Sequence, residues 1–152
     1  DPIPHLDGER VGAFFTPADQ RSDDQQAVDA FSMALIDELK TADHIVLGLP
    51  MYNFGIPSQL KSWIDHVARA GITFRYTENG PQGLLDDKPV TVLAARGGLY
   101  AGTENDTVTP YIKLFFGFIG MTDVNFVYAE GLNMGDETKE KAMSEAQAAL
   151  AG

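Results

Sequence analysis

The sequence predicts an α/β fold built on a parallel sheet, and two observations lead to this prediction. Apolar runs of strand length at 45–49, 90–95 and 124–128 alternate with segments whose apolar residues recur at helical spacing. Helical connections between such strands favour right-handed crossovers, which place helices on the faces of the sheet. The 152 residues, 44% of them hydrophobic, suffice for one core, so we expect a single domain over residues 1–152.

The first half of the chain predicts two helices around one strand. Ser22-Asp23-Asp24-Gln25 has the spacing of a capping box, which starts a helix. The apolar positions that follow at helical intervals are Val28, Phe31, Leu35, Ile36 and Leu39. The strand Ile45–Leu49 comes next, and a second helix then presents Leu60, Trp63, Ile64 and Val67 on one face.

The second half predicts two further strands and two further helices. Turn residues stand at Asn79, Gly80, Pro81 and Gly83, before a buried strand over Val90–Ala95. Thr109-Pro110 has the form of an N-cap followed by proline at the first helical position, so we expect a helix over Tyr111–Ile119. A strand over Val124–Tyr128 precedes a last helix through Ala149, capped by Asp136 or Thr138.

Composition excludes several classes of function. Without cysteine the chain can form no disulfide, zinc–thiolate site or cysteine nucleophile. A formal charge of −11 argues against a nucleic-acid groove, and no apolar run has the length of about 18 residues that a membrane span needs. The three histidines, His5, His44 and His66, lack carboxylates at ligand spacing, so we expect no metal site. We expect a cytoplasmic protein.

The most informative segment follows the first strand. The strand stops at Pro50, a polar and aromatic loop spans Met51–Phe54, and a helix begins after Pro57. Such a loop lies at the carboxyl edge of a parallel sheet, where open α/β folds bind ligands. Arg96-Gly97-Gly98 follows the second strand in the same way. Each run taken alone is also compatible with an ordinary turn between a strand and a helix.

Taken together, several segments in order resemble the FMN-dependent NADH azoreductases, which are quinone reductases of flavodoxin-like fold. The resemblance rests on Pro50–Phe54, Ile56–Lys61, Val67–Gly71, Phe74–Pro81, Arg96–Gly98 and Phe116–Gly120. It implies a three-layer sandwich and a homodimer that binds FMN. NADH or NADPH would reduce the FMN, and quinones or aromatic azo compounds would reoxidise it in a ping-pong cycle. Because a flavin carries the hydride chemistry itself, we expect no catalytic side chain.

The resemblance also assigns roles residue by residue. It implies that the flavin is bound by Pro50, Met51, Tyr52, Asn53, Phe54, Ala95, Arg96, Gly97 and Gly98. It implies that planar substrates are stacked by Tyr76, Tyr100, Phe116 and Phe118. Ala95 departs from the serine of the family and lacks its hydroxyl, and Tyr100 stands in place of a histidine, so the polarity of the pocket is expected to differ.

In this family a strand, a serine-rich phosphate loop, a helix and a second strand precede the segment that matches Pro2–Pro4. The resemblance therefore implies that the first unit and the phosphate loop are absent from this chain, and it leaves open whether the chain binds FMN or is active. Two alternatives remain: a flavodoxin-type one-electron carrier, and a truncated, flavin-free interaction protein. The sequence does not identify the physiological acceptor or the preferred nicotinamide cofactor.

Overall fold

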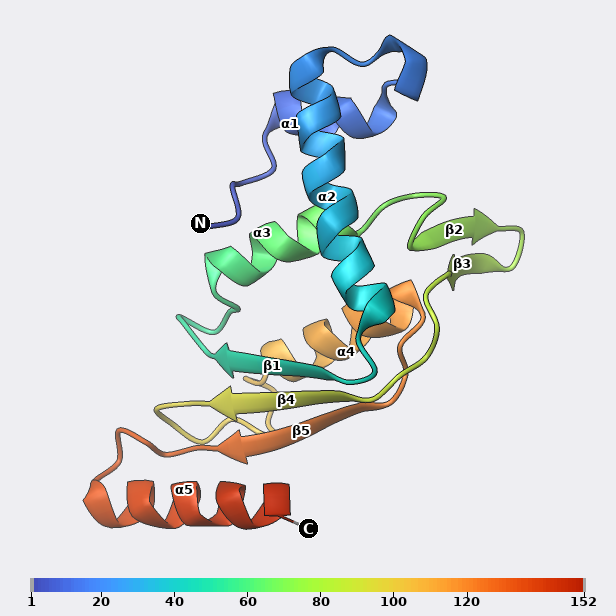
Figure 1. Ribbon diagram of the computed structural model, residues 1–152. Helices are drawn as coiled ribbons and strands as arrows, with labels where there is room; N and C mark the ends of the chain where they lie inside the picture. Colours follow the sequence, from blue (N-terminus) through green and yellow to red (C-terminus); the bar gives the residue numbers. More distant parts are fainter. Residues whose placement is uncertain (1, 152) are drawn as a thin grey trace. The chain divides into compact units, whose positions relative to one another are not determined.

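A computed structural model describes residues 2–151 (Figure 1). The chain divides into two compact units. The first contains the described residues up to Ala42, together with Ser58–Asp86 and Phe118–Gly120. The second contains Asp43–Pro57, Asp87–Gly117 and the described residues from Met121 onward.

The second unit is built on a three-stranded parallel sheet. Its strands are β1 (Ile45–Pro50), β4 (Val90–Ala95) and β5 (Val124–Ala129), in the order β1-β4-β5. The arrows of all three point the same way in Figure 1. In the register, Pro50 lies beside Ala95, which in turn pairs with Ala129. All three strands therefore end together, as the alternation of strands and helices predicts.

Helices cover both faces of this sheet. In α4 (Val108–Ile119), the Lys113 Nζ lies 5.8 Å from the ring centroid of Phe126. Phe126 and Tyr128 point to the same face of β5, because alternate residues of a strand share a face. On the opposite face, Met143 of α5 (Asp136–Ala151) and Val127 line one apolar groove. The unit therefore has three layers, helix, sheet and helix, as the flavodoxin-like resemblance implies (Figure 1).

The first unit is mainly helical. It contains α1 (Gly8–Phe15), the 3-10 turn Ala18–Gln20, α2 (Asp23–Thr41) and α3 (Ser58–Val67). The carboxylate of Asp29 on α2 forms ion pairs with Arg21 at 2.7 Å and Arg69 at 2.6 Å. The guanidinium of Arg69 lies 3.9 Å from the ring centroid of Phe14, so one buried arginine joins α1 to α2.

A β-hairpin completes the first unit. Its strands are β2 (Phe74–Thr77) and β3 (Gly80–Gly83). The prediction that Gly80, Pro81 and Gly83 are turn residues is wrong, because they form β3. Proline is tolerated there since β3 pairs with β2 alone among the described residues. At its end, an added Cβ on Gly83 would lie 2.2 Å from the backbone nitrogen of Gly120.

Two further differences from the predicted elements concern helix starts. The helix α1 is not predicted, although Asp7 caps it by accepting a hydrogen bond from the Arg10 N–H at 2.9 Å. Helix α4 begins at Val108, before the predicted Thr109-Pro110 start, because the Asp106 side chain accepts the Thr109 N–H. The capping box at Ser22 is confirmed. Among the described helices, none is both long and apolar enough to cross a bilayer.

Candidate functional site

The loop after β1 contains a strained turn. Tyr52 and Gly55 each donate an N–H to the other's carbonyl, at 2.9 and 3.0 Å. Between them Asn53 and Phe54 have φ values of 49° and 62°. These features define a type I′ turn, which favours glycine at the position that Phe54 holds. Because phenylalanine rarely adopts this conformation, the turn stores strain on the order of 1 kcal/mol, which is typical of ligand-binding loops.

The loops after β1, β4 and β5 meet at the carboxyl edge of the sheet and enclose a hollow of about 360 Å³. Its lining consists of Met51, Asn53, Phe54, Gly97, Gly98, Tyr100 and Asn133. The volume lies within the range of small-molecule sites. All of these residues belong to the second unit. The predicted flavin loops are therefore brought together, and Tyr100 joins them.

The hollow offers backbone donors. Four N–H groups in its lining donate to no protein acceptor among the described residues, those of Asn53, Phe54, Gly97 and Gly98. The glycines are needed for close approach. An added Cβ on Gly97 would lie 2.6 Å from the side-chain nitrogen of Asn133, and one on Gly98 would lie 3.1 Å from the ring of Tyr100. The edge therefore presents open donors beside aromatic and apolar side chains.

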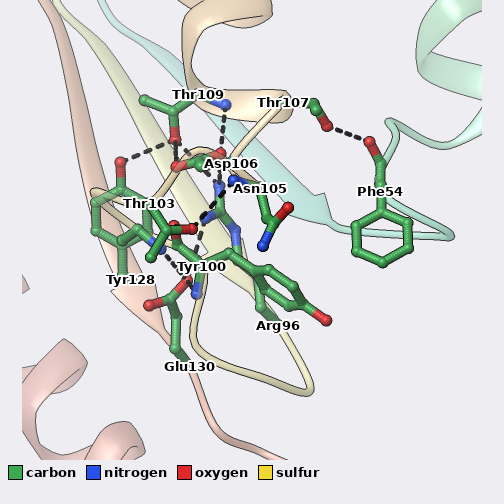
Figure 2. Close-up of polar contacts among 11 residues, drawn as sticks. Phe54, Arg96, Tyr100, Thr103, Asn105, Asp106, Thr107, Thr109, Tyr128 and Glu130 are labelled. Atoms are coloured by element: carbon green, nitrogen blue, oxygen red, sulfur yellow. Dashed lines mark hydrogen bonds and ion pairs between the residues drawn. The ribbon is translucent and has the colours of Figure 1, made fainter.

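Beneath this edge lies a buried group of polar residues, the Arg96 cluster, which consists of Arg96, Asp106, Thr109, Tyr128 and Glu130 (Figure 2). The Arg96 side chain is 1% exposed. Its guanidinium donates to Asp106 at 3.0 Å, Thr109 at 3.1 Å and Glu130 at 3.1 Å, and lies 5.0 Å from the ring centroid of Tyr128. The side chain is therefore fully committed within the protein.

Asp106 is the carboxylate of this cluster that contacts both Arg96 and Thr109. Burial by itself would raise the pKa of Asp106, but hydrogen bonds from Arg96 and Thr109 outweigh burial and place the pKa below its usual value. The Thr109 hydroxyl donates to Asp106 at 2.7 Å, so Tyr128 is the donor in the 3.0 Å contact between its hydroxyl and that of Thr109. The carboxylate is therefore charged and fixed.

The cluster also anchors the segment 97–107, which we call the 97–107 loop. Glu130 Oε1 accepts the N–H groups of Tyr100 at 3.0 Å and Ala101 at 2.9 Å. The loop in turn holds the turn after β1, since the Thr107 hydroxyl donates to the Phe54 carbonyl (Figure 2). The rings of Phe54 and Tyr100 meet edge to face with centroids 5.9 Å apart. The two predicted flavin loops are thus physically coupled.

The remaining predicted flavin residues lie next to the hollow without lining it. Pro50 and Ala95 are register partners at the ends of β1 and β4. Tyr52 is 61% exposed and flanks the turn. The backbone of Arg96 lies at this edge of the sheet, where its N–H donates to the Ala129 carbonyl at 2.9 Å. Its side chain belongs to the Arg96 cluster and does not line the hollow.

The four residues predicted to stack substrate fall in different surroundings. Tyr100 lines the hollow, whereas Phe116 is 1% exposed within the second unit. In the first unit, the ring of Phe118 lies 4.2 Å from that of Phe74, which also contacts Tyr76 at 5.5 Å. Tyr76 is 75% exposed. Two of the four therefore belong to each unit.

Asn133, Asp106, Thr107 and Glu130 were not identified from the sequence. A signal existed for Asn133, because 131–135 follows β5 and so reaches the same carboxyl edge as the other two loops. Asp106 carried the local signal of a helix cap, since it accepts the Thr109 N–H three residues on. Thr107 and Glu130 act through partners distant along the chain, which no local pattern indicates. Within residues 2–151, no group of three metal-ligating side chains is arranged to hold a metal ion.

The hollow fits the flavin that the resemblance implies. An isoalloxazine is flat, apolar on its faces and rich in acceptors along one edge. The open N–H groups of Gly97 and Gly98 suit such acceptors, and the two glycines let Asn133 and Tyr100 pack against this backbone. Met51, Phe54 and Tyr100 supply apolar and aromatic surface. The donor set and the lining are those that a planar heteroaromatic ring requires.

Comparisons with known proteins identify the family of the chain. A family model described as "Flavodoxin-like fold" matches residues 1–152. The chain is 83% identical over 150 residues to the FMN-dependent NADH:quinone oxidoreductase of Alcanivorax borkumensis, covering 99% of this chain and 76% of that protein. It is 60% identical over 151 residues to FMN-dependent NADH:quinone oxidoreductase 6 of Burkholderia lata, with the same coverage.

Solved structures give the same picture. The crystal structure of an FMN-dependent NADH-azoreductase from Bacillus anthracis in complex with FMN is similar with a TM-score of 0.86 at 31% identity, covering 99% of this chain and 76% of that chain. Azoreductase AzrA has a TM-score of 0.86 at 29% identity, covering 98% of this chain and 75% of its own. With its fold and the loops at the sheet edge already in agreement, the chain belongs to the flavodoxin-like family of FMN-dependent NADH:quinone oxidoreductases.

Proposed function

We propose that this protein binds FMN at the hollow and uses it to pass reducing equivalents from NADH to quinones and aromatic azo compounds. The observation that carries the proposal is the set of four open backbone N–H groups, from two loops, around one hollow at the carboxyl edge. Relatives named for this activity share up to 83% of their aligned residues with the chain, which supports the same assignment.

The bound flavin supplies the hydride chemistry, and the protein supplies the surroundings. The N–H groups of Gly97 and Gly98 would donate to acceptor atoms on the edge of the ring and would favour negative charge there. The strained turn presents Asn53 and Phe54 N–H groups from the other loop. Met51, Phe54 and Tyr100 exclude water from the ring face. We assign no acid or base role to a side chain.

The substrates are planar, so aromatic walls would orient them by stacking. Tyr100, which lines the hollow, is the first candidate, and Tyr76, Phe116 and Phe118 remain candidates from the resemblance. We propose a ping-pong order, in which the oxidised nicotinamide leaves before the acceptor enters. Initial-velocity measurements at several NADH and quinone concentrations test this order, since parallel double-reciprocal lines are expected.

We further propose that residues 1–152 act as one FMN-binding domain, that NADPH can replace NADH, and that the protein acts as a homodimer in the cytoplasm. Sedimentation of the FMN-loaded protein tests the dimer. Rates measured with NADH and with NADPH at equal concentration test the donor preference. The family resemblance is the support for these assignments, and each has its own measurement.

The main test combines FMN binding with turnover. Quenching of flavin fluorescence on titration should show saturable binding, and NADH oxidation should then depend on an added quinone. The Gly97→Ala variant places a methyl group 2.6 Å from Asn133 in the hollow and should weaken FMN binding. Gly12→Ala is the matched control, because its Cβ would meet nothing within 4 Å. Equal FMN affinity in both variants would refute the assignment of the site.

A further inference from the structure

The turn after β1 needs an external support. Its two internal hydrogen bonds join Tyr52 to Gly55, and neither involves the carbonyl of Phe54. Phe54 adopts a φ of 62°, although its side chain cannot bond to the nearby backbone as that of Asn53 can. The ring of Phe54 is 59% exposed, so burial does not fix it. Within the turn, the Phe54–Gly55 peptide is held through its Gly55 N–H, which donates to the Tyr52 carbonyl, and a contact to the Phe54 carbonyl adds a second constraint.

Thr107 makes that contact. Its hydroxyl donates to the Phe54 carbonyl across a sequence separation of 53 residues. Thr107 does not line the hollow, and its hydroxyl donates to the Phe54 carbonyl. Any influence of Thr107 on a bound molecule therefore passes through the turn.

The position of Thr107 is itself determined. Its neighbour Asp106 is 9% exposed and is joined to the buried Arg96 at 3.0 Å. The N–H of Thr107 donates to the Asn105 carbonyl at 3.1 Å. The fixed Asp106 and the hydrogen bond to Asn105 together restrict the backbone at Thr107 and so the position of its hydroxyl. The rigidity of the Arg96 cluster is in this way passed to the turn (Figure 2).

We propose that Thr107 is a positioning residue for FMN binding. Its hydroxyl adds a hydrogen bond to the Phe54–Gly55 peptide, and the turn held in this way keeps the N–H groups of Asn53 and Phe54, which belong to the two preceding peptides, oriented toward the flavin. The inference rests on the proposed function, because the turn contributes to FMN binding only if FMN occupies the hollow. It adds a residue from outside the hollow to the parts of the protein that set flavin affinity.

The experiment compares three variants. Thr107→Val removes the hydroxyl at nearly constant volume, and Thr107→Ser restores it. Thr41→Val is the matched control, because it removes a threonine hydroxyl that donates to the Asp37 carbonyl at 2.8 Å at the end of α2. Hydrogen–deuterium exchange of the FMN-free proteins follows the amides of 52–55, where the Gly55 N–H reports opening of the turn. Fluorescence quenching then gives the Kd for FMN.

We expect Thr107→Val to exchange faster at 52–55 and to bind FMN about threefold to tenfold more weakly, the effect of one lost neutral hydrogen bond. Thr107→Ser should restore both quantities to within about twofold, since the hydroxyl is retained. Thr41→Val should match the parent protein in both. A kcat with quinone close to that of the parent at saturating FMN would agree with a role in positioning.

Unchanged exchange at 52–55 in Thr107→Val would overturn the proposal, because the turn would then hold without the hydroxyl. Faster exchange with unchanged FMN affinity would overturn it as well, since the turn would not matter to the flavin. A Thr107→Ser variant as impaired as Thr107→Val would overturn it too, because the retained hydroxyl would then not suffice to hold the turn. If the parent protein fails to bind FMN, the proposed function fails, and the exchange data still show whether Thr107 holds the turn.

Discussion

Arg96 holds three polar partners from different parts of the second unit, Asp106, Thr109 and Glu130. A bidentate, planar group is required for this, because a lysine ammonium cannot reach all three in the same geometry. The side chains of Arg96, Asp106 and Glu130 are 1%, 6% and 13% exposed. Removal of the arginine alone leaves two carboxylates without their cation in a region that water barely reaches.

We therefore expect Arg96→Met to lower the free energy of unfolding by about 3–5 kcal/mol, the effect of breaking a buried ion pair from one side. Urea denaturation followed by circular dichroism measures it. Lys61→Met is the matched control, because it removes the cation of an exposed helical pair with Asp65, which contributes about 0.3–0.5 kcal/mol. Similar decreases in the free energy of unfolding for Arg96→Met and Lys61→Met would show that burial does not strengthen the Arg96 ion pairs.

Asp106 gives the pH dependence of the same cluster. Its pKa is lower in the folded protein than in the unfolded chain, so its stabilising contribution is complete above the unfolded value of about 3.9. The contribution is lost as the pH falls through the folded value. We expect the urea concentration at the unfolding midpoint to decrease as the pH is lowered below about 4. The decrease should be less steep in Asp106→Asn. Identical pH profiles for the two proteins would contradict the assignment.

Sequence patterns predicted which backbone segments meet at the hollow, but not the contacts that their side chains make. Met51–Phe54 and Gly97–Gly98 follow buried strands, and the topology of a parallel sheet brings such segments together. The partners of the Arg96 side chain stand 10 to 34 residues away, and those residues carry no periodic signal. Thr107 and Phe54 are further apart still. Side-chain bonds between loops depend on the folded backbone, so they become visible only in the structure.

At the scale of the elements, strong local signals were sufficient and weak ones were not. The capping box at Ser22 and the apolar spacing after it predicted α2 correctly. The shorter α1 contains Gly8 and Gly12, which lower helix propensity, and it gains its stability from packing on α2. The predicted start of α4 after Thr109-Pro110 was wrong, because the helix begins at Val108 with the Asp106 side chain accepting the Thr109 N–H.

The end of the β2–β3 hairpin is the element most sensitive to one atom. An added Cβ on Gly83 would lie 2.2 to 2.4 Å from backbone atoms of Ile119 and Gly120, a distance at which the backbone must move. We expect Gly83→Ala to lower the free energy of unfolding by about 1–3 kcal/mol, the range found for overpacked sites. Gly80→Ala is not a suitable control, since Gly80 has a φ of 102°.

Gly48→Ala is the better comparison, because its Cβ would meet nothing within 4 Å and its φ is ordinary. Thermal melts of Gly83→Ala and Gly48→Ala, measured side by side, separate the steric effect from a general change of glycine to alanine. Equal melting temperatures in the two variants would show that the hairpin end moves freely.

For the whole molecule, the alternation of strands and helices determined the fold class, and the order β1-β4-β5 follows from two helical connections. The formal charge of −11 acts at this scale too. A net negative protein repels anionic ligands such as FMN over long range. FMN is therefore held by directed N–H groups and by packing. Binding of this kind should stabilise the folded protein against unfolding.

We expect FMN at a hundred times its Kd to add about 2.7 kcal/mol to the free energy of unfolding. For a chain of this size the melting temperature should rise by about 5–10 °C. Differential scanning calorimetry with increasing FMN measures the shift. ADP is the control, because it carries phosphate but no isoalloxazine and should leave the melting temperature unchanged. A rise with ADP equal to that with FMN would show that the ring is not recognised.

The contact between Gly83 and Gly120 has a consequence for the history of this chain. Most crowded contacts between side chains can be relieved by a second mutation that makes the neighbouring side chain smaller. The two positions can then change together. Here each added Cβ would strike main chain: Gly83 meets the backbone at Gly120, and Gly120, at a φ of 115°, meets the carbonyl of Leu85 at 2.4 Å. No compensating substitution can remove a main-chain atom. A substitution at either position is accommodated by a movement of the main chain, so we expect the two glycines to be exchanged less readily than positions whose neighbours are flexible side chains.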